Sequence, residues 1–120
     1  MKKKILIIED EQTLIQALLD NFKDEDYRIE TAIDGEIGWE KIKSFKPDMI
    51  LLDLVLPKID GFTLLTRIKA DDEVKDTPVI VLTNLSDAVE KCAEMGAVFC
   101  LVKSNESVEN IKKNVQKVLG

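Results

Sequence analysis

Five short apolar runs alternate with segments of helical periodicity along the chain. We predict strands at residues 5–8, 28–32, 49–54, 79–83 and 99–102. Residues 5–8, 49–52 and 79–82 form continuous apolar runs within three of these strands. Such runs are typical of parallel strands that are buried on both faces. The alternation therefore indicates a parallel sheet covered by helices.

Helices are predicted from apolar residues that recur at three- and four-residue spacing. The apolar faces are, in chain order, Leu14, Ile15, Leu18, Leu19 and Phe22; Trp39, Ile42 and Phe45; Leu64, Leu65 and Ile68; Val89, Cys92 and Ala93; and Val108, Ile111, Val115, Val118 and Leu119. Five strand–helix units fill the chain, so we expect one domain over residues 1–120. Right-handed crossovers predict an α/β fold with a doubly wound five-stranded parallel sheet and helices on both faces. Periodicity alone leaves the strand order open.

Net charge and hydropathy narrow the classes of function. The chain has 17 basic and 23 acidic residues, a net charge of −6, which argues against direct binding to nucleic acid or to an anionic membrane. No apolar run approaches the roughly 20 residues of a membrane span. The apolar run behind the lysines at positions 2–4 is shorter than the about 7–15 residues of a signal sequence. We therefore expect a cytoplasmic protein.

The two cysteines, Cys92 and Cys100, do not form a C-x-x-C motif. Two thiols are also too few for the disulfide framework of a small secreted domain. We expect both to be reduced and mainly structural.

Polar side chains stand at or directly after the carboxyl ends of four of the predicted strands. They are Glu9 and Asp10, Asp53, Thr83 and Lys103. Because ligands of open parallel sheets bind at the carboxyl ends of the strands, we expect these side chains to converge there. Three carboxylates that meet would repel one another, and the site would hold either a cation or shared protons. We favour Mg²⁺, which prefers oxygen ligands.

The same residues predict phosphoryl transfer. A carboxylate such as Asp53 can act as a covalent phosphate acceptor, and Thr83 and Lys103 can contact the oxygens of the transferred group. Each residue also has an ordinary structural explanation: Asp and Thr often cap helices or form turns, and a lysine at a strand end is usually solvated. Their joint occurrence at four strand ends favours the functional interpretation.

The chain resembles a response-regulator receiver domain over essentially its whole length. The resemblance rests on the acidic opening at residues 5–11 (ILIIEDE), the block at residues 47–61 (PDMILLDLVLPKIDG), Thr83, Gly96-Ala97 and Lys103. It implies the flavodoxin-like strand order 2-1-3-4-5. It also implies phosphorylation of Asp53, contacts of Thr83 and Lys103 with the phosphoryl group, and Mg²⁺ bound by Glu9, Asp10, Asp53 and the backbone carbonyl of Val55. Pro57 and Gly61 fit a turn into a helix, with Asp60 as N-cap.

The implied function is that of a signalling switch rather than an enzyme. The resemblance implies that a sensor histidine kinase or histidine phosphotransfer protein supplies the phosphoryl group. The face formed by the fourth helix, fifth strand and fifth helix would then change and signal to a downstream protein or effector domain. We expect a monomer or weak homodimer in a two-component system or phosphorelay. The chain contains no histidine, so it is not itself the phosphohistidine donor.

Three positions depart from the family pattern. Ser104 follows Lys103 where a proline is common, so we predict a trans bond and a less constrained loop, because a cis bond without proline costs about 2.5–4 kcal/mol. Cys100 replaces the aromatic switch residue, and strand alternation directs Phe99 to the opposite face. Asn84 stands where a small residue is typical and is expected to narrow access to the site.

Two other functions compete with the phosphorylation switch. One is a phosphorylation-independent receiver-like module for protein interaction, which the departures near Lys103 favour. The other is a Mg²⁺-dependent phosphohydrolase with an Asp nucleophile. That class needs a second acid two residues beyond the nucleophile, where this chain has Val55.

The apolar residues Val55 and Leu85 further predict slow loss of phosphate from Asp53, because they orient an attacking water poorly.

Overall fold

The computed structural model of the chain describes residues 2–120, apart from the side chain of Ser86. The strands are β1 (Lys3–Ile8), β2 (Tyr27–Ala32), β3 (Met49–Leu52), β4 (Val79–Thr83) and β5 (Phe99–Val102). The helices are α1 (Gln12–Phe22), α2 (Gly35–Phe45), α3 (Gly61–Ala70), α4 (Val89–Glu94) and α5 (Val108–Leu119). Single 3₁₀ turns occur at Ser86–Ala88 and Lys103–Asn105. Within residues 2–120, no helix is both long and apolar enough to span a membrane.

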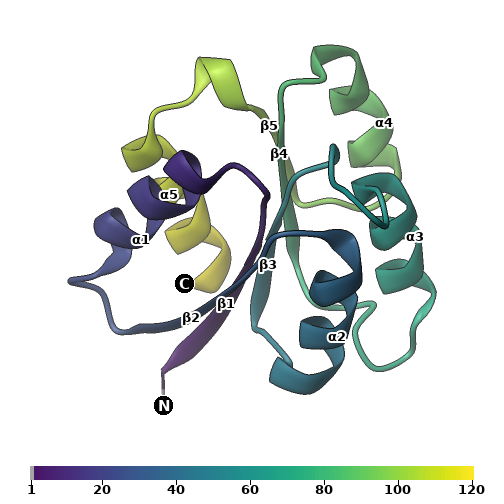
Figure 1. Cartoon of the computed structure of the whole chain (residues 1–120), viewed down its shortest axis with the longest axis horizontal. Coiled ribbons are helices and arrows are strands. Elements are labelled where there is room, and N and C mark those ends of the chain that lie inside the picture. Colours follow the sequence, from purple (N-terminus) through teal and green to yellow (C-terminus); the bar gives the residue numbers. More distant parts are fainter. Residues whose placement is uncertain (1) are drawn as a thin grey trace.

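All five strands are parallel and lie in the order β2-β1-β3-β4-β5. The sheet divides the molecule, with α1 and α5 on one face and α2, α3 and α4 on the other (Figure 1). Both the predicted doubly wound fold and the strand order 2-1-3-4-5 are confirmed. The order reverses between β1 and β3, and the carboxyl ends of these two strands are therefore the expected location of a site.

Alternate residues of each strand pack into two separate cores. Ile5 and Ile7 of β1 join Leu18 and Phe22 of α1 and Ile111 of α5 on one face. Leu6 and Ile8 lie on the other face with the core of α2, α3 and α4. The central strands β3 and β4 are buried throughout, which explains their unbroken apolar sequences.

The predicted third strand is two residues too long. The strand ends at Leu52, although the Asp53 amide still donates a hydrogen bond to the Ile8 carbonyl at 3.0 Å. The Asp53 carboxylate then accepts a hydrogen bond from the Val55 amide at 3.1 Å. This local turn competes with further strand pairing, and it leaves Leu54 outside the strand.

Three helices begin with a side-chain cap. Asp34, Asp60 and Ser107 accept hydrogen bonds from the amides three residues ahead, at 2.8, 3.0 and 3.0 Å. Each bond satisfies an amide that has no partner within the helix. The predicted N-cap role of Asp60 is confirmed, and it fixes the start of α3 close behind Asp53 in the chain.

The α4 region corrects two predictions. The helix has six residues, and of the predicted apolar face only Cys92 is buried, whereas Ala93 is exposed. Cys92 forms a disulfide with Cys100 of β5, so the prediction of reduced thiols was wrong. Sequence spacing does not show that α4 packs directly on the strand that follows it.

Candidate functional site

Three carboxylates meet at the carboxyl ends of β1 and β3. Glu9 and Asp10 follow β1 directly, and Asp53 follows β3. One oxygen of each carboxylate lies within 4.8 Å of the others. Glu9 and Asp53 are buried, with exposed fractions of 2% and 5%, whereas Asp10 is exposed. The predicted convergence of these three side chains is therefore found.

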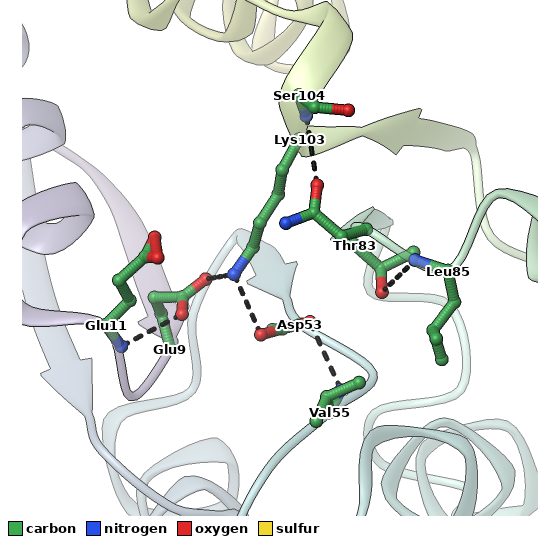
Figure 2. Close-up of polar contacts among 9 residues, drawn as sticks. Glu9, Glu11, Asp53, Val55, Thr83, Leu85, Lys103 and Ser104 are labelled. Carbon is green, nitrogen blue, oxygen red and sulfur yellow. Dashed lines mark hydrogen bonds and ion pairs between the residues drawn. The ribbon is translucent and has the colours of Figure 1, made fainter.

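The Lys103 side chain lies between Glu9 and Asp53, the two buried acids. Lys103 directly follows the carboxyl end of β5. Its Nζ is 2.7 Å from Glu9 Oε1 and 2.9 Å from Asp53 Oδ2 (Figure 2). Burial alone would lower the pKa of this lysine, but the hydrogen bonds to the two carboxylates outweigh burial and raise it. Lys103 is thus held in its charged form inside the site.

The environment of Glu9 raises the pKa of its carboxyl group. Burial raises the pKa of Glu9, and the charge of Asp53 raises it further. Hydrogen bonds from Lys103 and from the Glu11 amide, the latter 3.0 Å long, oppose this rise without cancelling it. The single ammonium group of Lys103 therefore compensates only part of the negative charge of the two buried carboxylates. The carboxylate oxygens are suitable ligands for an additional hard cation.

The backbone after Asp53 is held closely against α3. The Gly61 amide donates a hydrogen bond to the Leu54 carbonyl at 2.9 Å. A Cβ atom at Gly61 would lie 2.4 Å from the Asp53 carbonyl oxygen, a distance that real Cβ atoms do not reach. Only glycine permits this approach, so the predicted turn into the helix serves to position Asp53.

Thr83 is fully buried at the end of β4, the strand next to β3. Its Oγ1 accepts a hydrogen bond from the Leu85 amide at 3.2 Å (Figure 2). This bond orients the hydroxyl within the β4–α4 loop, whereas Glu9 and Asp53 contact Lys103 directly. Asp10 joins these residues through the carboxylate cluster, and Thr83 belongs neither to that cluster nor to the contacts of Lys103.

The β4–α4 and β5–α5 loops are joined by Asn84, a role that sequence analysis missed. The Ser104 amide donates a hydrogen bond to Asn84 Oδ1 at 3.0 Å. The described chain contains no cis peptide bond, which confirms the trans bond predicted at Ser104. Proline has no amide hydrogen to donate, so this hydrogen bond requires a residue other than proline at position 104. The combination of Ser104 with Asn84 was therefore the feature of the sequence that could have indicated it.

A cavity of about 240 Å³ opens beside the clustered carboxylates. Its lining residues are Asp10, Glu11, Asp53, Val55, Asn84 and Lys103. Asn84 thus lines the cavity, and its side chain accepts the hydrogen bond from the Ser104 amide. Carboxylate oxygens and the nearby backbone carbonyl of Val55 are ligand types that Mg²⁺ accepts. The lysine adds a positive charge that can face an anionic group.

Residues 5–116 match the family model described as the response regulator receiver domain. The chain therefore belongs to the response regulator receiver domain family. This family serves two-component systems, in which response regulators receive their signal from histidine kinases and act on effectors. Receiver domains bind Mg²⁺ in an acidic pocket.

Two curated relatives illustrate the resemblance in sequence. The chain is 35% identical over 118 residues to the response regulator ArlR of Staphylococcus aureus, covering 97% of this chain and 52% of the relative. It is 38% identical over 88 residues to the DNA-binding dual master transcriptional regulator RpaA of Synechocystis, covering 73% and 36%. The chain thus spans about half the length of these relatives or less.

Solved structures show the same architecture. The chemotaxis response regulator CheY4 of Vibrio cholerae superposes with a TM-score of 0.87 at 28% identity, over 98% of this chain and 99% of that one. CheY in the CheX–CheY–BeF₃–Mg²⁺ complex of Borrelia burgdorferi superposes with a TM-score of 0.86 at 30% identity, over 98% and 90%. The chain is therefore CheY-like in fold.

Proposed function

We propose that residues 1–120 act as a receiver domain in which Asp53 accepts a phosphoryl group in a Mg²⁺-dependent step. The observation that carries this proposal is the arrangement around Asp53. Its buried carboxylate contacts Lys103 at 2.9 Å, lies among the three clustered acids and lines the 240 Å³ cavity. A nucleophile, a counter-charge and cation ligands thus surround one opening.

In the transfer, a carboxylate oxygen of Asp53 forms a bond to phosphorus while the phosphorus–nitrogen bond of a donor phosphohistidine breaks. Lys103, already charged, neutralises one oxygen of the transferred group, and the Thr83 hydroxyl can donate to another after turning from its present bond. Glu9, Asp10, Asp53 and the Val55 carbonyl would hold Mg²⁺, which supplies positive charge to the phosphoryl oxygens. These are the roles that the resemblance to receiver domains implies.

The donor would be a sensor histidine kinase or a histidine phosphotransfer protein. Phosphorylation would shift the α4–β5–α5 face between two states and alter its binding to a downstream protein or effector domain. We propose that the chain acts in this way in the cytoplasm, the compartment typical of the family. It would act as a monomer or weak homodimer, and as a signalling domain that assists its own phosphorylation and dephosphorylation.

The test is intact-mass spectrometry after incubation with acetyl phosphate and Mg²⁺. One added phosphoryl group is expected, and Asp53→Asn should abolish it while the exposed control Asp24→Asn retains it. Omitting Mg²⁺ should reduce the adduct at least about tenfold. If the folded wild-type chain gains no phosphoryl group, the phosphorylation-independent interaction module is the better description. Continuous turnover of phosphate monoesters would instead indicate a hydrolase.

A further inference from the structure

The disulfide pair lies on the face that the proposed function would use as its output. Cys92 belongs to α4 and is fully buried, and Cys100 belongs to β5 and is partly exposed. Their Cα atoms are 6.5 Å apart, within the range of about 4.4–6.8 Å that disulfides require. The two cysteines are eight positions apart in the sequence, so the bond joins the helix to the strand that immediately follows it.

Strand alternation directs Cys100 toward α4. Cys100 pairs with Val81 in the sheet and packs with Cys92 in the core below α2, α3 and α4. The neighbours Phe99 and Leu101 pack in the opposite core, as predicted for Phe99. Cys92 Sγ also lies 3.3 Å from the Val89 carbonyl oxygen, so the reduced thiol has a hydrogen-bond acceptor in place. The fold can therefore accommodate both the thiol and the disulfide.

The strand that carries Cys100 also leads to the predicted phosphorylation site. Lys103 follows the end of β5 directly and contacts Asp53 at 2.9 Å. Any displacement of Lys103 on phosphorylation would be transmitted along β5 to Cys100, three residues earlier. A bond from Cys100 to Cys92 would resist a relative movement of β5 and α4.

We propose that Cys92 and Cys100 form a reversible redox lock on the α4–β5 face. The inference rests on the proposed phosphorylation switch. In the dithiol form, α4 is free to move relative to β5, and phosphorylation of Asp53 changes the face. In the disulfide form, the covalent bond holds α4 on β5, and phosphorylation no longer changes it. The chain would then signal only when it is both phosphorylated and reduced.

The chemistry requires a low-molecular-weight disulfide as the oxidant. The partly exposed Cys100 thiolate attacks this disulfide, a mixed disulfide forms and one small thiol leaves. The Cys92 thiolate then attacks the Cys100 sulfur and displaces the second small thiol. The protein loses two electrons and two protons, and the oxidant is reduced to two thiols. A dithiol reductant reverses both steps and would attack Cys100, the less buried of the two residues.

The test compares the complete chain in its two redox forms. Oxidised glutathione and dithiothreitol prepare the forms, and alkylation followed by intact-mass measurement counts the free thiols. Beryllium fluoride with Mg²⁺ serves as the phosphoryl mimic, and amide hydrogen exchange is followed in α4 and in the loop after Asp53. In the reduced chain, the mimic should change exchange in α4 by roughly tenfold or more, whereas the oxidised chain should show no such change. Cys100→Ser and Cys92→Ser should respond like the reduced chain under both conditions.

Several outcomes would overturn the proposal. Two alkylatable thiols after treatment with oxidised glutathione would exclude the lock, and so would a disulfide that dithiothreitol does not open in the folded chain. An equal response of α4, or none, in both redox forms would also exclude it, provided that the Val55 amide still responds to the mimic. If the reduced chain shows no response even at Val55, the proposed phosphorylation switch fails together with the lock.

Discussion

Lys103 is the residue on which the electrostatics of the site depend. It is the cation that contacts both buried carboxylates, Glu9 and Asp53, and its own side chain is only 13% exposed. A buried charge that loses its partner is costly, because water does not replace the lost interaction. The burial of Glu9 and Asp53 in the metal-free protein is therefore coupled to Lys103.

We predict that Lys103→Met destabilises the metal-free protein by about 3 kcal/mol, since two buried carboxylates are left without a counter-charge. Millimolar Mg²⁺ should recover a large part of this loss, because the clustered acids then gain a new cation. Urea unfolding with Mg²⁺ and with EDTA measures both effects. Lys113→Met, at an exposed position of α5, is the matched control. A loss that is equally large with and without Mg²⁺ would contradict this account.

Among the helices, α3 shows most clearly how the residues at a helix start stabilise it. Its N-cap Asp60 accepts hydrogen bonds from the amide and the hydroxyl of Thr63, at 3.0 and 2.9 Å. These bonds, the amide first, lower the pKa of Asp60. Because Gly61 follows and packs on the Asp53 backbone, the cap also stabilises the loop that carries the predicted phosphoacceptor.

We predict that Asp60→Ala costs about 1 kcal/mol of stability at neutral pH. The pKa of Asp60 is lower in the folded protein than in the unfolded chain, where it is about 3.9. The charged cap therefore stabilises the fold at pH values above about 3.9, and this stabilisation is lost as the pH falls through the pKa of the folded protein. Asp60→Asn keeps an acceptor but does not titrate, so its stability should approach or exceed that of the wild type only in acid. Urea unfolding from pH 2.5 to 7 tests the sign. A constant difference between the two proteins over this range would show that the Asp60 charge is irrelevant.

The two loops beside the cavity are coupled through Asn84. Asn84→Ala removes the acceptor of the Ser104 amide, and a lost hydrogen bond of about 1 kcal/mol should raise the exchange rate of that amide about fivefold. NMR-detected hydrogen exchange measures this directly. Asn105→Ala, an exposed change in the same 3₁₀ turn, should leave the Ser104 amide unaffected. Equal exchange rates in Asn84→Ala and the wild type would mean that the bond does not hold the loop.

At the scale of the whole molecule, the fold can be predicted from the sequence because strands that are buried on both faces, such as β1, β3 and β4, have continuous apolar sequences. The sequence also predicts which polar residues reach the same edge, since parallel strands present their carboxyl ends together. Contacts between side chains from distant elements are not visible in the same way. The ion pair of Lys103 with Glu9 and the bond between Asn84 and Ser104 depend on loop geometry that periodicity does not encode. The contact of Cys92 with Cys100 likewise depends on how the short α4 packs.

The lifetime of the proposed phosphoryl group on Asp53 would be a property of the whole molecule, because residues from several elements control how water reaches the site. Val55 lines the cavity, and Leu85 follows the buried Thr83 by two residues; their exposed fractions are 56% and 39%. Apolar side chains at the opening neither donate nor accept hydrogen bonds, so they do not orient a water molecule for attack on an acyl phosphate.

We therefore predict that phosphorylated Asp53 loses its phosphate over minutes or longer at saturating Mg²⁺. Val55→Asn places an amide at the opening and should shorten the lifetime about tenfold or more, within the usual range for a positioned polar group. The isosteric control Val55→Thr adds a single hydroxyl and should have a smaller effect, while Val98→Asn, at an exposed site next to β5, should have none. A time course of phosphate release after removal of acetyl phosphate decides the matter. Loss within seconds in the wild type would show that water reaches Asp53 without help from these side chains, and that the apolar opening does not set the lifetime.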